Sequence, residues 1–289
     1  MTLLVTAASG ALGHLVVDAL LARGVAPEQI VAGARTPAKA ADLAERGVAV
    51  VPLDYDDAAS VEAAFAGVDR VLLISGSEVG KRAAQHQTVV DAAVSAGVEQ
   101  LVYTSLAQVE RSSLALAPEH LATERAIAAS GLPATILRND WYAENYVANL
   151  DQVAATGVLL SATRGGRVAA AARADYAEAA AVALIGDAHI GKVYELAGRP
   201  LTYDDIAAAM GEALGRTVVH RNVSEDELRA ALEGAGLDAG TVGFLAGLDA
   251  GIAEGDLDVD DPTLAELIGR EPTPLVDVLR AARGAATGS

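Results

Sequence analysis

The 289 residues contain no cysteine. A chain without thiols forms no disulfides and offers no cysteine nucleophile, thiolate zinc site or iron–sulfur cluster. Redox chemistry in such a chain needs a cofactor that carries the electrons. The five histidines supply no metal site either, because their positions match none of the spacings that zinc ligands follow. We therefore expect no bound metal.

Lysine is also scarce, because three of the 21 basic residues are lysines, namely Lys39, Lys81 and Lys192. Acidic residues number 39, which gives a formal net charge of -18 at pH 7. A surface of this sign repels phosphate backbones and anionic membrane surfaces. We expect neither a nucleic acid nor a membrane as a partner.

Long hydrophobic runs are missing as well. No stretch approaches the roughly 18 uncharged apolar residues of a membrane-spanning helix. No basic segment precedes a hydrophobic one at the start, as a signal peptide requires. Hydrophobic residues still make up 52% of the chain, which is enough for one large core or two fused ones. We expect a cytoplasmic protein.

Short apolar runs do occur, and they alternate with amphipathic helical patterns through the first half of the chain. These runs are residues 3–5, 30–32, 48–51, 71–74, 101–103 and 134–137. Fully apolar strands separated by helices are typical of a parallel sheet that is covered on both faces. We predict an α/β fold with a doubly wound, Rossmann-type parallel sheet, formed by a domain over residues 1–138.

The pattern changes after about residue 138, where helical stretches dominate and glycine is frequent. We expect residues 139–289 to form a smaller, mostly helical domain that binds the substrate. One strand-like piece, residues 193–196, is expected to return to the first sheet.

The first apolar run leads into a turn of small residues that opens a helical pattern. In a dinucleotide site, glycines in such a turn let backbone N–H groups approach the pyrophosphate, and the helix N-terminus faces the phosphates. Gly10 and Gly13 fit the second and third glycine positions, while Ala7 replaces the first. This replacement costs little if Ala7 keeps a negative φ. We assign cofactor binding to the turn residues Ala7, Ala8, Ser9, Gly10, Ala11, Leu12 and Gly13.

The end of the second apolar run indicates which dinucleotide binds. An acidic residue there would bond the ribose hydroxyl of NAD, whereas an arginine accommodates the 2′-phosphate of NADP. The chain has Arg35 at this position and Lys39 one turn later. Two cations in a chain of net charge -18 favour NADP(H) over a solvated strand end.

Two further strand ends carry candidate cofactor residues. Asp54 follows the third run, where it accepts from an adenine amino group or caps the next helix. Ser75, Gly76 and Ser77 follow the fourth run, at the sheet edge where the ribose and nicotinamide pass. Small residues at this place also form ordinary turns.

Proton donation is restricted by the scarcity of lysine. Most short-chain dehydrogenases use a tyrosine and a lysine four residues later, which lowers the pKa of the phenol so that it protonates the substrate carbonyl. None of the seven tyrosines here has a lysine at that distance. The usual alcohol–ketone and sugar-nucleotide epimerase mechanisms are therefore excluded. Where the pair would fall, the chain has His120 and Glu124 instead.

Aromatic residues are few, at 3% of the chain, but they concentrate after the sixth strand. The segment Arg138–Tyr146 contains the single tryptophan, Trp141, together with Tyr142 and Tyr146. Aromatic faces at this sheet edge are suited to stack a flat substrate against a nicotinamide ring. A hydrophobic hinge between two domains is the alternative.

Several motifs occur together over nearly the whole chain: Thr6–Gly13, Arg35, Leu72–Ser75 followed by Ser77–Gly80, Tyr103–Ser105, Glu119–His120, Arg138–Asn145, Arg173–Tyr176 and Lys192–Gly198. In this combination the chain resembles the NmrA-like atypical short-chain dehydrogenases. Within them it is most similar to the NAD(P)H:quinone oxidoreductase branch, which is close to the triphenylmethane reductases. Two residues depart from the family pattern: Ala7 replaces the first glycine, and Asp140 stands where glycine is usual.

The resemblance implies a Rossmann domain with a small C-terminal domain and a quinone that enters between them. It also implies NADP(H) contacts along Ala7–Leu12, at Arg35 and along Ser75–Ser77. Further implied contacts come from the segment after the sixth strand, through Asn139, Trp141, Tyr142 and Glu144.

A quinone needs little help to accept hydride, because its product is an aromatic hydroquinone anion. We therefore hypothesise two-electron transfer from NADPH to a quinone without flavin or metal. Tyr103, Trp141 and Tyr142 would shape the pocket, and His120 would donate a proton through water. Two alternatives stay open: an NADP-binding redox sensor without turnover, and a reductase of a triphenylmethane dye, an azo compound or an imine. The oligomeric state, with a homodimer as one option, stays open as well.

Overall fold

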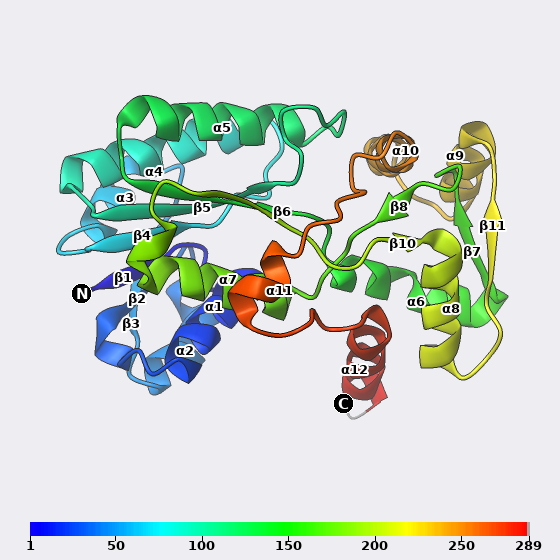
Figure 1. The fold of residues 1–289 in the computed structure, drawn as a ribbon, viewed down its shortest axis with the longest axis horizontal. Coiled ribbons are helices and arrows are strands. Elements are labelled where there is room, and N and C mark those ends of the chain that lie inside the picture. Colours follow the sequence, from blue (N-terminus) through cyan, green and yellow to red (C-terminus); the bar gives the residue numbers. More distant parts are fainter. Residues whose placement is uncertain (288–289) are drawn as a thin grey trace.

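The computed structural model describes residues 1–287, and within them the main feature is a seven-stranded parallel sheet (Figure 1). Its strands follow the order β3-β2-β1-β4-β5-β6-β9. They are β1 (Leu3–Val5), β2 (Ile30–Ala34), β3 (Ala49–Pro52), β4 (Arg70–Leu73), β5 (Gln100–Leu106), β6 (Ala134–Asn139) and β9 (Val193–Leu196). The predicted Rossmann-type sheet is confirmed. The order reverses between β1 and β4, where such sheets bind their ligands.

Helices cover both faces of this sheet, so its strands are buried on both sides. One face carries α1 (Ala11–Ala22), α2 (Ala41–Glu45), α7 (Arg173–Ile185) and α11 (Thr263–Ile268). The other face carries α3 (Ala58–Ala64), α4 (Arg82–Ala96) and α5 (Ala117–Ser130). The apolar strands and the alternating helices thus form the layered core that their sequence pattern predicts.

Strands β5 and β6 extend beyond their apolar runs, and this extension helps to position the site. The polar residues Thr104 and Ser105 continue β5 because they pair in parallel with Leu137 and Arg138 of β6. Both strands therefore reach further toward the carboxyl edge than hydrophobicity alone predicts. Their ends, Leu106 and Asn139, pair with each other at that edge.

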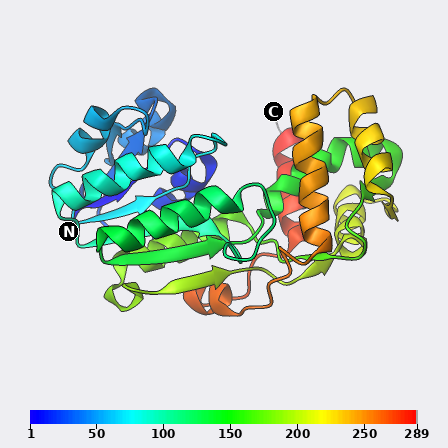
Figure 2. The same cartoon turned by 90° about the horizontal axis from the view of Figure 1, so that it is seen from above.

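The second lobe is built from short strands and helices around its own apolar core. Two strand pairs lie there: β7 (Val158–Ser161) with β11 (Val219–Asn222), and β8 (Arg167–Val168) with β10 (Leu201–Thr202). Its helices are α6 (Leu150–Thr156), α8 (Tyr203–Leu214), α9 (Glu225–Gly234), α10 (Ala239–Ala253) and α12 (Leu275–Thr287). The first strand, β1, and the last helix that the structure describes, α12, lie in different lobes (Figure 1 and Figure 2).

The chain crosses between the lobes more than once. After β8 it returns to the main sheet through α7, which packs on α1, and through β9, which pairs with β6. It returns again through α11, which packs on α7. Short 3₁₀ helices occur at Pro27–Gln29, Pro37–Ala40, Ala143–Asn149 and Asp187–His189. Among residues 1–287, no helix has the length and hydrophobicity that a membrane crossing needs.

Candidate active site

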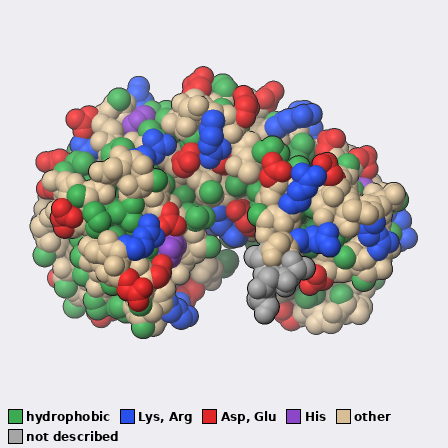
Figure 3. All heavy atoms as spheres, turned by 90° about the horizontal axis from the view of Figure 1, so that it is seen from below, with side chains coloured by type: hydrophobic (Ala, Val, Ile, Leu, Met, Phe, Trp, Pro, Cys, Tyr) green, Lys and Arg blue, Asp and Glu red, His purple; other side chains and the backbone are tan. Residues whose placement is uncertain are grey.

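A cleft of about 690 Å³ lies at the carboxyl ends of the central strands. The space-filling view shows a hollow between the two lobes (Figure 3). Most of the residues that we singled out in the sequence line this cleft together: Ala7, Ser9, Gly10, Ala11, Leu12, Gly13, Arg35, Asp54, Ser75, Gly76, Ser77, His120, Asn139, Trp141 and Tyr142. The structure thus joins segments from across the first half of the chain.

Three of the residues assigned to the cofactor contacts or to the pocket wall do not line the cleft. Ala8 is fully buried, and its N–H donates to Gly33 O at 2.9 Å, which ties the turn to β2. Tyr103 is fully buried behind His120. Glu144 accepts from the backbone N–H of Arg173, with both carboxylate oxygens 3.0 Å from that nitrogen. These residues act on the cleft only through their neighbours.

The turn between β1 and α1 is a close-packed backbone crossing. A Cβ on Gly13 would lie 2.4 Å from Ala7 O and 2.8 Å from Ala8 Cα. Only glycine fits there, because both atoms belong to the backbone. The N-cap of α1 is Gly10, and no side chain bonds the first N–H groups of the helix. The open N–H groups and the positive end of the helix dipole suit a diphosphate.

Ala7 has a φ of +49°, so the condition under which its replacement of glycine costs little is not met. The turn places this residue in the left-handed region, where its carbonyl accepts from the Gly10 N–H at 2.9 Å. For an L-residue with a Cβ, that conformation costs roughly 1–2 kcal/mol. Glycine is therefore favoured at the first position of the turn because it adopts a positive φ without strain, and this chain has a strained alanine there instead.

Arg35 lies at the β2 end of the cleft and is largely exposed, with 66% of its side chain accessible. Its Nη1 is 2.9 Å from Glu78 Oε1, and Lys81 Nζ is 3.0 Å from Glu78 Oε2. Hydrogen bonds from Lys81 and Arg35 lower the pKa of the Glu78 carboxyl. Lys39, the second predicted cation, is exposed and does not line the cleft. The second cation near this end is Lys81.

Asp54 lines the cleft, and it does not cap the helix that follows. The N-cap of α3 is Asp57, whose side chain accepts from the N–H groups of Ala59 and Ser60. One of the two roles expected for Asp54 is therefore taken by another residue. Its place in the cleft agrees with the other role, contact with an adenine.

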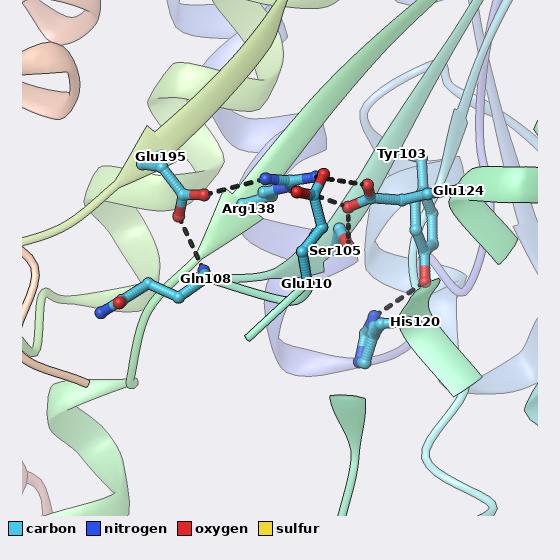
Figure 4. A network of polar contacts seen from close by, with 8 residues as sticks. All are labelled: Tyr103, Ser105, Gln108, Glu110, His120, Glu124, Arg138 and Glu195. Atoms are coloured by element: carbon cyan, nitrogen blue, oxygen red, sulfur yellow. Dashed lines mark hydrogen bonds and ion pairs between the residues drawn. The ribbon is translucent and has the colours of Figure 1, made fainter. Parts of the chain in front are cut away.

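His120 lies at the opposite end of the cleft, and Tyr103 Oη is 2.8 Å from its Nδ1 (Figure 4). Burial lowers the pKa of His120 to about 3, and the nearby Arg82 guanidinium acts in the same direction. Burial also raises the pKa of the Tyr103 phenol. Both groups are uncharged at neutral pH, so His120 offers a neutral N–H or a lone pair rather than an imidazolium proton.

Buried side chains hold the loop after β4 in place. The Gly76 N–H donates to His86 Nε2 at 3.0 Å, which leaves the His86 Nδ1 proton to donate to Thr123 Oγ1. Arg82 Nε donates to Gly76 O at 2.8 Å, and its Nη1 is 2.8 Å from Glu119 Oε2. These bonds fix residues 75–77 at the edge of the cleft.

Asp140, which stands where the family usually has glycine, lines the cleft between Asn139 and Trp141. Its side chain is 4% exposed, and Oδ1 accepts from the Trp141 N–H at 2.7 Å. Among residues 1–287, no group bonds its Oδ2. Burial raises the pKa of this carboxyl well above its usual value, which favours the neutral acid.

Arg138 joins the elements beneath this end of the cleft (Figure 4). Its guanidinium pairs with Glu124 of α5 at 2.8 Å, Glu195 of β9 at 3.2 Å and Glu110 at 3.0 Å. Hydrogen bonds donated to these carboxylates, above all to Glu124, raise the pKa of the Arg138 guanidinium. Glu124 is thus a structural partner of Arg138 and does not replace the missing tyrosine–lysine pair.

The cleft also contains residues that we did not single out in the sequence: Tyr55, Glu78, Arg82, Arg173 and Phe244. Arg173 and Glu78 belong to motifs that carry the family resemblance. The sequence therefore pointed to their segments but not to their place in the cleft. Phe244 lies on α10 and had no sequence signal at all. Within residues 1–287, no cluster of three or more His, Asp or Glu side chains is arranged to hold a metal ion.

Similarity to known proteins agrees with this geometry. "Quinone oxidoreductase 2" of Escherichia coli (strain K12) is 45% identical over 274 residues, which cover 94% of this chain and 96% of that protein. The crystal structure of an E. coli NADPH-dependent quinone oxidoreductase complexed with NADPH aligns with a TM-score of 0.93 and 44% identity, covering 97% of this chain and 99% of that one.

A triphenylmethane reductase from Citrobacter sp., complexed with NADP(H), aligns with a TM-score of 0.92 and 36% identity, over 97% of this chain and all of that one (100%). The model of the NmrA-like family matches residues 1–245. This chain therefore belongs to the NmrA-like family.

Proposed function

We propose that this protein is an NADPH-dependent oxidoreductase that passes hydride directly to a quinone-type acceptor, without flavin or metal. The observation that carries the proposal is one continuous cleft. It joins the open N-terminus of α1 and Arg35 to the aromatic segment that contains Trp141 and Tyr142. The E. coli relative, 45% identical, bears the name of a quinone oxidoreductase, and a similar structure holds NADPH.

The residues of the cleft fit NADPH in its usual orientation for this fold. The N–H groups of Ala11 and Leu12 would hold the diphosphate, Arg35 would bind the 2′-phosphate, and Asp54 would accept from the adenine. Ser75–Ser77 border the ribose, and Asn139, Trp141 and Tyr142 border the nicotinamide end. When bound, NADPH supplies the hydride.

The residues at the nicotinamide end position the acceptor and exclude water. Trp141 and Tyr142 provide flat faces for a ring. His120, supported by Tyr103, holds an uncharged nitrogen at the cleft wall, which hydrogen-bonds the acceptor or relays a proton through water. Since a hydroquinone anion is a stable product, alignment of the acceptor supplies much of the catalysis.

The proposal is tested by following NADPH absorbance with purified protein and a panel of quinones. We expect oxidation of NADPH that depends on the quinone, in protein shown by its absorbance spectrum to hold no flavin. The same assay with a triphenylmethane dye, an azo dye and an imine identifies the preferred acceptor class. A flavin spectrum that accompanies all activity would contradict the proposal.

A redox sensor without turnover is the second candidate. The exposed Arg35–Glu78 pair is the observation in its favour, because a bound 2′-phosphate would change the contacts of a surface loop. Tight NADPH binding without oxidation on any acceptor would support the sensor and reject the enzyme.

Location, assembly and domain division are further proposals. We propose a cytoplasmic protein with a Rossmann domain over residues 1–138, which α7, β9 and α11 complete, and a substrate domain formed by the rest of residues 139–289. The homodimer is tested by analytical ultracentrifugation, and the location by cell fractionation.

A further inference from the structure

Arg173 stands out among the cationic residues of the cleft. Of the three arginines that line it among residues 1–287, Arg35 pairs with Glu78 at 2.9 Å and Arg82 pairs with Glu119 at 2.8 Å. The guanidinium of Arg173 has no carboxylate within 4.0 Å in this part of the chain. Among residues 1–287, Arg173 is thus the one arginine of the cleft without an ion pair.

Neutral groups hold this guanidinium in place. Its Cζ lies 5.0 Å from the centroid of the Tyr142 ring, in cation–π contact, and Nη2 donates to Asn145 Oδ1 at 3.2 Å. Its own backbone N–H is taken by Glu144, which fixes the start of α7. Most of the N–H donors of the Arg173 guanidinium therefore have no hydrogen bond to other groups within residues 1–287.

The position of Arg173 separates it from the diphosphate region. Its partners Tyr142 and Asn145 follow β6, which stands three strands from β1 in the sheet order. Three spacings of about 4.8 Å place the end of β6 roughly 14 Å from the end of β1, where the Ala7–Gly13 turn begins. An anion bound by Arg173 therefore lies at the reacting end.

We propose that Arg173 is a catalytic residue that binds the oxyanion formed on the acceptor. This inference rests on the proposed function. When a quinone takes up hydride, one electron pair forms the new bond to hydrogen and another is left on an oxygen as a phenolate. Arg173 donates hydrogen bonds to that oxygen, and a proton from water then completes the hydroquinone. NADPH is the reductant, so atoms and electrons balance.

The first test separates binding from turnover with the variants Arg173→Gln and Arg173→Lys. We expect Arg173→Gln to lower kcat/KM for a quinone about 100-fold, as loss of an oxyanion donor does. Its Kd for NADPH should stay within about two-fold of wild type. Arg173→Lys keeps the charge without the fork and should recover part of the loss. The control Arg125→Gln removes one exposed charge on α5 and should change neither.

A second readout does not use turnover. 4-Nitrophenol, bound in the presence of NADP⁺, reports its ionisation through its absorbance. We expect the pKa of the bound phenol to be lowered in wild type and this shift to disappear in Arg173→Gln. A shift that survives in Arg173→Gln would overturn the inference. A loss of NADPH affinity as large as the loss of kcat/KM would overturn it too, and would assign Arg173 to the cofactor phosphates.

Failure of the proposed function gives a different pattern. Wild-type protein would then leave NADPH unoxidised with every quinone, whereas failure of the inference alone leaves wild type active and Arg173→Gln equally active.

Discussion

The two ends of the cleft use charge in opposite ways. Around Arg35 the charged groups are exposed and paired with one another, so water screens them and exchange with a ligand costs little. Around His120 and Asp140 the titratable groups are buried, and their pKa values move toward the uncharged forms. One end is suited to select a phosphate. At the other end Arg82 is paired with Glu119, and Arg173 is the cation without an ion pair among residues 1–287.

The largest expected effect is a loss of stability, and it comes from a substitution in the turn between β1 and α1. Gly13→Ala places a Cβ 2.4 Å from Ala7 O, and neither backbone can yield. We expect a loss of about 3 kcal/mol in the free energy of unfolding and no measurable NADPH binding, by urea unfolding and fluorescence titration. In the control, Gly10→Ala, the nearest atom is 3.2 Å away, so the loss should be much smaller. Equal losses in both variants would contradict the close packing.

Because histidines near the His120 end of the cleft are buried and neutral, we expect the free energy of unfolding to fall in acid. Burial lowers the pKa values of His86 and His120 to about 3, whereas both titrate near 6.5 when unfolded. Their contribution to stability is therefore present above pH 6.5 and is lost as the pH falls toward 3. At pH 5 each costs about 2 kcal/mol. Urea unfolding between pH 7.5 and 5 should show the loss, with a shallower slope in His86→Gln.

His14 provides the matched control for this slope. Its pKa is raised: burial acts against the shift, but the bonds and charges of Asp42 and Asp18 outweigh it. Its contribution is fully present below pH 6.5 and is lost at higher pH, so His14→Gln should steepen the acid loss. A slope that is unchanged in both variants would show that the buried histidines do not stay neutral.

At the exposed end of the cleft, we expect substitutions to change only the affinity for a cofactor that carries the 2′-phosphate. We expect Arg35→Ala to raise the Kd for NADPH about 30-fold, the size of a lost charged hydrogen bond, with little change for NADH. Glu78→Gln should tighten NADPH about two- to five-fold, because Glu78 competes for Arg35. Both are measured by titration. Weaker NADPH binding in Glu78→Gln would mean that Glu78 helps to hold the cofactor.

A smaller effect is expected at the outer wall of the neutral end. Phe244 on α10 lines the cleft and is 39% exposed, and Leu237 is equally exposed (39%) but lies outside it. Phe244→Ala should raise the KM for a quinone about five-fold through lost ring contact, and Leu237→Ala should leave it unchanged. Steady-state kinetics that show no difference between the two variants would remove Phe244 from the acceptor site.

The smallest effect concerns the strained alanine of the turn. Ala7→Gly removes the Cβ from a residue with φ +49° and should stabilise the fold by about 1 kcal/mol, with NADPH affinity retained. Thermal unfolding and a cofactor titration measure both. A destabilised variant would show that the methyl group of Ala7 packs usefully against the core.

The sheet and much of the cleft lining were predictable because both depend on local patterns. Apolar runs mark the strands, and a parallel sheet brings their ends to one edge, so Gly13, Arg35 and Asn139 meet by topology alone. The conformation of Ala7 was not predictable in this way, because its φ depends on how the Gly13 backbone crosses the turn.

Contacts between distant segments escaped the sequence for a different reason. Arg173 reaches the cleft because α7 returns to the main sheet, and Phe244 because α10 of the second lobe borders the cleft. No periodicity in the sequence indicates where a returning helix is placed. Tyr103 shows the reverse case: it ends an apolar run and was expected at the pocket wall, but the ring is fully buried and supports His120 from behind.

The division of labour between the two ends is tested most directly by single-turnover hydride transfer at saturating NADPH. Arg35→Ala should transfer hydride to a quinone at a rate within about two-fold of wild type, although its Kd for NADPH is much higher. That result would assign Arg35 to binding alone. A hydride-transfer rate that falls as far as the affinity would contradict the account, because the exposed end would then also control the reaction.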